Sequence, residues 1–145
     1  MTNVVFTTYK QQPEGSADDA ATASLLKENG VTVDSIPWDQ EQVQWADYDL
    51  VVPRSCWDYH LRADEFRVWL ERLKESGARV ANSVDTLRWN MHKSYLRELE
   101  SKGISILPTI WLEKGSDAEL SSLLMERGWQ EAVIKPMISA DADNT

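Results

Sequence analysis

One short sequence pattern occurs four times in this 145-residue sequence and constrains its fold more than any other feature. A glycine follows a charged segment and precedes an apolar one in KENGVTV, KESGARV, ESKGISI and MERGWQEAVI, at Gly30, Gly77, Gly103 and Gly128. A glycine in the left-handed conformation commonly ends a helix, so each glycine predicts a helix end followed by an apolar segment. The sequence therefore predicts helices that alternate with strands.

Six apolar segments are predicted to be strands, and the first of them alternate with helices through short connections. This order favours an α/β fold with a Rossmann-like parallel open sheet over residues 1–83. After a boundary near residues 82–84 the order becomes helix, strand, helix, strand, which favours a small α+β subdomain over residues 84–145. The predicted strands are residues 3–8, 31–36, 49–52, 79–82, 106–112 and 132–136.

The predicted helices carry start signals or apolar stripes. Ser16 with Asp19, and Ser116 with Glu119, are predicted to form capping boxes at two helix starts. Helices are predicted over residues 83–102 and 117–127. Apolar side chains at helical spacing predict two buried stripes, one made of Phe66, Trp69, Leu70 and Leu73, the other of Leu87, Met91, Tyr95 and Leu99.

The composition limits the classes of partner and compartment. The formal net charge is −9, without a separate cluster of Lys or Arg, which argues against nucleic acid or an anionic membrane as a partner. The single cysteine, Cys56, excludes an intramolecular disulfide, and no apolar run is long enough for a signal peptide or a membrane span. We therefore predict a reduced, cytoplasmic protein. His60 and His92 lack metal-ligand spacing, so no metal site is predicted in this chain.

The segment LVVPRSCWDYH combines an apolar strand with an unusual set of polar and aromatic residues. Arg54, Trp57, Asp58 and Tyr59 follow the strand and its terminal proline. In open α/β sheets, ligands bind outside the carboxyl ends of the strands. The segment therefore lies where a ligand is expected.

Two lysines are candidates for binding an anion. Lys135 ends an apolar strand in VIKP, where a half-buried ammonium is costly unless it meets an anion such as phosphate. Lys93 shares a predicted helix face with Trp89 and Arg97. Each lysine also has a simpler interpretation: Lys135 as a solvated strand end, and Lys93 as part of a solvated cationic face.

Taken together, these segments resemble the start of an ATP-grasp domain. The resemblance rests on NMHKSYLRELESKGISILPT, on EAVIKP and on the small-residue segment SADADNT, while RSCWDYH and RWNMHKSYL resemble a RimK-like and glutathione-synthetase-like subgroup. It implies an ATP- and Mg²⁺-dependent ligase that joins a carboxylate to an amine or thiol through an acyl phosphate. Residues 1–83 would form the pre-ATP-grasp domain, and residues 84–145 the first part of the ATP-grasp domain. The nucleotide-binding residues implied are Lys93, Lys135, Ser139 and Thr145.

The same resemblance implies that the loop after the third strand faces a substrate. Arg54 would bind a carboxylate as a bidentate pair, and Asp58 would bind an amine or hydroxyl. Trp57 and Tyr59 would form the walls of the site. Alternatively, the two aromatic side chains cap the sheet edge, and Asp58 caps the next turn.

Parts of the ATP-grasp pattern lie outside this sequence. The segment at 139–145 has no glycine and carries Asp141 and Asp143, and no metal-ligand set of the family is found in these residues. We therefore expect the magnesium ligands downstream in a longer natural protein, and no ligation by this chain alone. The alternative is a free-standing Rossmann-like binding or interaction module without catalysis. The aromatic content also predicts self-association into a homo-oligomer.

Overall fold

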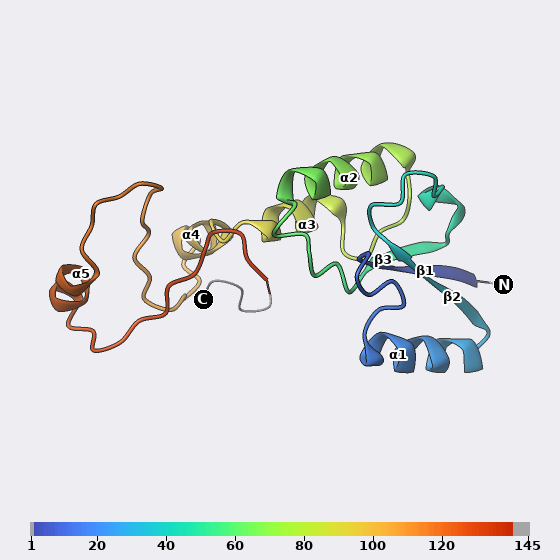
Figure 1. The fold of residues 1–145 in the computed structure, drawn as a ribbon, viewed down its shortest axis with the longest axis horizontal. Coiled ribbons are helices and arrows are strands. Elements are labelled where there is room, and N and C mark those ends of the chain that lie inside the picture. The colour runs from blue at the N-terminus through green and yellow to red at the C-terminus, as the bar shows by residue number, and fades with distance from the viewer. Residues whose placement is uncertain (1, 141–145) are drawn as a thin grey trace. The chain divides into compact units, whose positions relative to one another are not determined.

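The computed structural model describes residues 2–140 and divides the chain into two compact units, Met1–His92 and Lys93–Thr145. The first unit contains a three-stranded parallel sheet with the strand order β2-β1-β3. Helix α1 lies on one face of this sheet, and helices α2 and α3 lie on the other (Figure 1). The predicted α/β, Rossmann-like fold is therefore confirmed. The elements of this unit are β1 (Thr2–Thr8), α1 (Ala17–Glu28), β2 (Val31–Pro37), a short 3-10 helix η1 (Trp45–Asp47), β3 (Leu50–Pro53), α2 (Ala63–Ser76) and α3 (Val84–Met91).

The sheet register aligns the carboxyl ends of all three strands. Thr8 at the end of β1 pairs with Pro37 at the end of β2, and Thr7 pairs with Pro53 at the end of β3. Both neighbours of β1 are parallel to it, so the segments that follow the strands leave the sheet at the same edge. This edge is where the predicted substrate loop begins.

Aromatic side chains fill the core between the sheet and α2. The predicted stripe of Phe66, Trp69, Leu70 and Leu73 is buried, which confirms that face of α2. The Trp38 and Phe66 rings meet edge-to-face with centroids 5.1 Å apart, a geometry favoured by aromatic pairs. The core therefore links the end of β2 to α2.

Three of the predicted strands are not formed as strands in the structure. Residues 79–82 contribute only an isolated bridge between Val80 and Val51, and residues 106–112 and 132–136 form no strand among the described residues. A strand is defined by a hydrogen-bonded neighbour, and an apolar composition alone supplies no neighbour. The predictions located apolar segments correctly but assigned pairing that these residues do not make.

The predicted helix over residues 83–102 is two helices. Helix α3 ends at Met91 and α4 (Tyr95–Ser101) begins after a break, because the backbone N–H of Lys93 donates to the Met137 carbonyl at 2.8 Å instead of continuing the helix. The face that Lys93 was predicted to share with Trp89 and Arg97 is therefore interrupted.

The helix-boundary signals give mixed outcomes. The capping box at Ser16 and Asp19 is confirmed. The one at Ser116 and Glu119 is wrong, because α5 (Leu120–Arg127) begins later and the Ser116 hydroxyl instead accepts from the Ala118 N–H. The four repeated glycines all have positive φ, between 67° and 81°, as predicted for residues that close helices.

No helix within residues 2–140 has both the length and the apolar character needed to cross a membrane.

Leu70 is fully buried on α2, whereas Val68 on the same helix is 52% exposed. We expect Leu70→Ala to lower the free energy of unfolding by about 2–5 kcal/mol, because it removes buried methyl groups and leaves a cavity. Val68→Ala should change it by about 0.5 kcal/mol or less. Urea denaturation of both variants measures this, and equal losses would contradict the assigned core face.

Candidate functional site

The loop after β3 is attached to the central strand by its backbone. The N–H groups of Arg54 and Ser55 both donate to the Thr7 carbonyl, at 3.2 Å and 3.1 Å. This bifurcated contact turns the chain away from the sheet at the carboxyl edge. The predicted substrate residues therefore begin at the position expected of a ligand loop in an open α/β sheet.

A buried carboxylate holds the first two residues of this loop. Arg54 Nε donates to Asp19 Oδ1 at 2.7 Å, and the Ser55 hydroxyl donates to Asp19 Oδ2. Asp19 is only 2% exposed, whereas the Arg54 side chain is 39% exposed. The guanidinium carbon of Arg54 also lies 5.7 Å from the centre of the Phe6 ring. Arg54 is thus fixed on one edge and open to solvent elsewhere.

The surroundings of Asp19 favour its ionised form. Burial by itself raises the pKa of this carboxyl, but hydrogen bonds from Ser55, from the Ser16 backbone and from Arg54 outweigh burial and lower the pKa from 3.8 to about 2. Gly15 makes room for it, since a Cβ there would lie 2.8 Å from Asp19 Oδ2, and its φ of +78° suits glycine. Asp19 is therefore charged at neutral pH.

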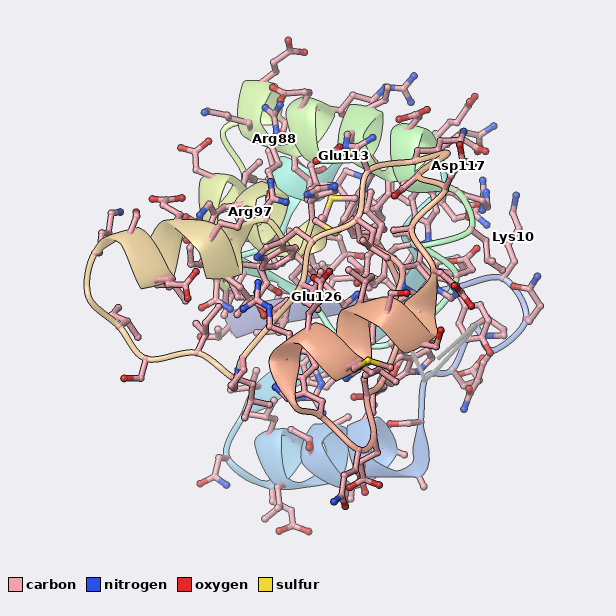
Figure 2. The ribbon with its side chains drawn as sticks, turned by 90° about the vertical axis from the view of Figure 1, so that its left-hand side faces the viewer. Lys10, Arg88, Arg97, Glu113, Asp117 and Glu126 are labelled. Carbon is pink, nitrogen blue, oxygen red and sulfur yellow. The ribbon has the colours of Figure 1, made fainter. Side chains whose placement is uncertain are left out.

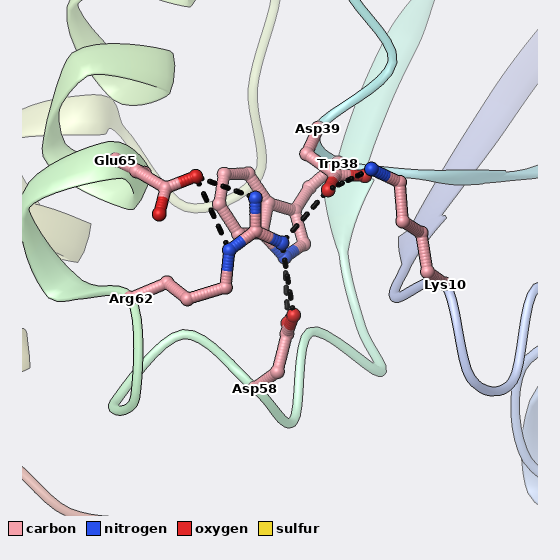
Figure 3. Close-up of polar contacts among 6 residues, drawn as sticks. All are labelled: Lys10, Trp38, Asp39, Asp58, Arg62 and Glu65. Carbon is pink, nitrogen blue, oxygen red and sulfur yellow. Dashed lines mark hydrogen bonds and ion pairs between the residues drawn. The ribbon is translucent and has the colours of Figure 1, made fainter.

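Asp58 belongs to a polar network rather than to the open part of the loop (Figure 3). Trp38 Nε1 donates to Asp58 Oδ1 at 2.8 Å, and Arg62 donates to Asp58 Oδ2 at 3.1 Å. The predicted role of Asp58 in binding an amine or hydroxyl stays a prediction. In this structure both of its oxygens have protein partners, and the residue is 7% exposed.

Arg62 is the centre of this network. Its guanidinium lies 4.6 Å from the centre of the Trp38 ring and also donates to Asp39 at 2.7 Å and to Glu65 at 2.6 Å. The hydrogen bonds to Glu65 and Asp39 raise the pKa of Arg62. Burial raises the pKa of Asp39, but Arg62 and Lys10 more than compensate and hold that pKa below its usual range. The network joins the end of β2, the substrate loop and the start of α2.

Three of the predicted substrate residues line one small cavity of about 160 Å³. Trp57 is 44% exposed, and Tyr59 packs against Phe66 with ring centroids 5.4 Å apart. The sequence did not identify the opposite wall, which α3 supplies. The cavity is lined by Pro53, Arg54, Cys56, Trp57, Tyr59 and Phe66, and by Leu87, Asn90 and Met91 of α3.

Cys56 is one of the residues that line this cavity. It is 7% exposed, its sulfur lies 3.1 Å from the Thr7 hydroxyl, and burial raises the pKa of its thiol to about 12. A thiol that stays protonated is a poor nucleophile, so the geometry fits packing rather than covalent chemistry.

A larger opening of about 790 Å³ is lined in part by the Arg62 network. Charged side chains of both signs line it, together with the edges of buried tryptophans. Its lining includes Lys10, Trp38, Asp39, Arg62, Glu65, Trp69 and Arg72. Sequence analysis did not identify this cavity, because most of its walls come from two separate parts of the chain, the segment after β2 and one face of α2.

The second unit brings together three of the four predicted nucleotide-binding residues. Lys93 Nζ donates to the Ser139 hydroxyl at 2.6 Å. Burial lowers the pKa of Lys93, and the positive charge of Lys135 lowers it further. Lys93 and Lys135 are therefore close enough to repel each other. Thr145, the fourth predicted residue, lies outside the described residues.

Arg97 of α4 has partners within its own unit (Figure 2). Its guanidinium carbon lies 4.7 Å from the centre of the Trp111 ring, and one terminal nitrogen lies 3.8 Å from a Glu113 carboxylate oxygen. The cation thus packs on the segment that was predicted to be a strand.

Within residues 2–140, no group of three or more His, Cys, Asp or Glu side chains is arranged to hold a metal ion.

Comparisons with known proteins give one consistent family. A family model described as the N-terminal domain of the D-cycloserine synthetase DcsG matches residues 4–82. The cycloserine biosynthesis protein DcsG of Streptomyces lavendulae is 33% identical over 89 residues, which make up 61% of this chain and 29% of that protein. A crystal structure of D-cycloserine synthetase DcsG superposes with a TM-score of 0.79 and 26% identity, over 95% of this chain and 47% of that one. The chain thus spans less than half of each of these relatives.

Arg62→Met should lower the free energy of unfolding by about 2–3 kcal/mol, because it leaves the buried carboxylates of Asp39 and Asp58 without their shared cation. Arg67→Met is the matched control, since Arg67 lies in the first turns of α2, next to Arg62 at the N-cap, and pairs with the exposed Asp64. The control should cost about 0.5 kcal/mol or less. Chemical denaturation compares the two, and an equal effect would show that the network does not stabilise the fold.

The lowered pKa of Asp19 predicts a pH-dependent contribution to stability. A carboxyl whose pKa falls from 3.8 to about 2 on folding contributes roughly 2 kcal/mol above pH 4, and this is lost as the pH falls toward 2. The stability difference between the wild type and Asp19→Asn should therefore shrink between pH 5 and pH 3. Urea titrations at these pH values measure it, and a constant difference would contradict the assignment.

Proposed function

Because this chain belongs to the family of D-cycloserine synthetase N-terminal domains, we propose that it is the N-terminal part of an ATP-grasp ligase. The ligase joins a small-molecule carboxylate to an amine or thiol. Support comes from the similarity to a cycloserine biosynthesis protein and from the sequence resemblance between residues 89–145 and the start of ATP-grasp domains. This chain by itself is inactive under the proposal.

The observation that carries the proposal is the grouping of Lys93, Lys135 and Ser139. Lys93 is partly buried and donates to the Ser139 hydroxyl, and burial and the charge of Lys135 lower its pKa, so an anion near these groups would favour the charged form of Lys93. A nucleotide phosphate between them would supply the missing negative charge, and all three groups can donate hydrogen bonds to phosphate oxygens. These residues fit the phosphates of ATP.

The first unit supplies the carboxylate subsite under this proposal. Arg54, Trp57 and Tyr59 line the small cavity, where the two aromatic side chains supply apolar walls. The larger polar cavity, which the Arg62 network lines in part, is not needed for this role. Substrate binding thus uses the exposed residues of the loop, and the buried residues hold it in place.

Under this proposal, transfer of the γ-phosphoryl group of ATP to the carboxylate would release ADP and give an acyl phosphate, and attack by the amine or thiol would then release phosphate. The resemblance to ATP-grasp domains implies that Mg²⁺ accompanies ATP in this step, and within residues 2–140 no group of three or more His, Cys, Asp or Glu side chains could hold a metal ion. The role of this chain is to bind and orient: the lysines hold phosphates, and Arg54 holds the carboxylate. We also propose a cytoplasmic location and a homo-oligomeric state.

Lys135→Met in the full-length protein should weaken ATP binding about tenfold or more, because a charge-assisted hydrogen bond contributes about 1.5–3 kcal/mol. Lys102→Met is the matched control, since Lys102 lies in the same unit and pairs with Glu98 at 2.6 Å. Isothermal titration calorimetry with ATP measures both variants.

If Lys135→Met leaves the ATP affinity unchanged, the proposed role of this lysine in nucleotide binding is refuted. A full-length protein that binds small carboxylates but neither binds nor hydrolyses ATP would favour the alternative, a Rossmann-like binding module without catalysis.

A further inference from the structure

Asp19 has more partners than its place in the sequence requires. The capping box accounts for its contacts with Ser16, whose N–H donates to Asp19 Oδ2 at 2.9 Å. Helix capping does not account for the contacts with Arg54 and Ser55, which lie on a different segment. The same carboxylate therefore connects the start of α1 to the first residues of the substrate loop.

The contact with Asp19 selects which edge of Arg54 is available. Arg54 Nε donates to Asp19 Oδ1 at 2.7 Å. Within the described residues, the two terminal nitrogens of Arg54 make no hydrogen bond or ion pair. A guanidinium binds a carboxylate through either its Nε edge or its terminal edge. Because Asp19 occupies the Nε edge of the Arg54 guanidinium, a ligand carboxylate can bind to the edge formed by the two terminal nitrogens.

We propose that Asp19 is a positioning residue that directs the terminal nitrogens of Arg54 toward the carboxylate of a small organic acid in the adjacent cavity. The inference rests on the proposed function, in which Arg54 binds the substrate carboxylate. The cavity of about 160 Å³ is close to the volume that holds one benzene molecule, so the acid has about six non-hydrogen atoms in this cavity. Its body contacts the apolar walls supplied by Trp57, Tyr59 and Leu87.

Two opposing effects decide whether substituting Asp19 weakens or strengthens the binding of a carboxylate ligand. The negative charge of Asp19 repels a ligand carboxylate, but three hydrogen-bond donors and the charge of Arg54 already compensate it. Releasing Arg54 restores freedom to a long side chain that must be fixed again on binding, which weakens affinity about threefold to tenfold. We take the loss of preorganisation to be the larger effect.

Butyrate and n-butylamine are matched probes, because they have the same length and opposite charge. Nuclear magnetic resonance titration of the 145-residue chain measures their affinities. Butyrate should bind to the wild type and n-butylamine should not. Asp19→Asn should weaken butyrate binding about threefold to tenfold. Ser16→Ala removes the cap contact to the Asp19 N–H without touching Arg54 and should stay within about twofold.

A double-mutant cycle separates positioning from a general loss of structure. In an Arg54→Ala background, Asp19→Asn should have no further effect on the residual affinity for butyrate, because its action passes through Arg54. An effect of the same size in both backgrounds would overturn the inference, as would butyrate binding that is unchanged or tighter in Asp19→Asn. Unchanged butyrate binding in Arg54→Ala alone would instead refute the carboxylate role of Arg54 in the proposed function.

If Asp19→Asn does not fold, the wild-type Arg54 signal decides the question. The Nε–H proton of Arg54 should exchange slowly with solvent both before and after butyrate is added, because its hydrogen bond to Asp19 is retained. Loss of this protection on binding would show that the ligand takes the Nε edge, and the inference would fail.

Discussion

The parallel pairing of β1 with both of its neighbours is the constraint on which the first unit depends. Since β2 and β3 run in the direction of β1, the segments that follow all three strands meet at one edge. The carbonyl of Thr7, on the central strand, then accepts the first two N–H groups of the loop after β3. A single backbone group thereby fixes where the loop starts and brings Arg54 beside the start of α1.

Two buried carboxylates hold the ends of this loop. Burying a carboxylate is costly unless hydrogen bonds and opposite charge compensate it. Asp19 meets that condition with Ser55, Arg54 and the start of α1, and Asp58 meets it with Trp38 and Arg62. Between these attachments the loop presents Trp57 to solvent. Both ends of the loop are therefore held by buried carboxylates, and Trp57 lies exposed between them.

Local signals in the sequence predicted local structure well. The repeated glycines, the cap at Ser16 and the stripe on α2 depend on neighbours within a few residues, and all three are confirmed. Features that depend on distant residues were missed. The Lys93 N–H that interrupts a helix bonds to Met137, and the Arg54 side chain bonds to Asp19, far away in the sequence. No spacing rule identifies such partners, and the wall that α3 supplies to the cavity was missed for the same reason.

Cations in the second unit illustrate how burial distinguishes a binding group from a structural one. Arg97 lies on an aromatic ring near Glu113, so its charge is balanced within the unit. Lys93 is partly buried, bonds to a neutral hydroxyl and lies close to a second lysine. A nearby anion favours the charged form of a partly buried ammonium that lies close to a second cation. The anionic ligand that we propose for these lysines would stabilise the folded second unit by an amount set by its concentration and affinity.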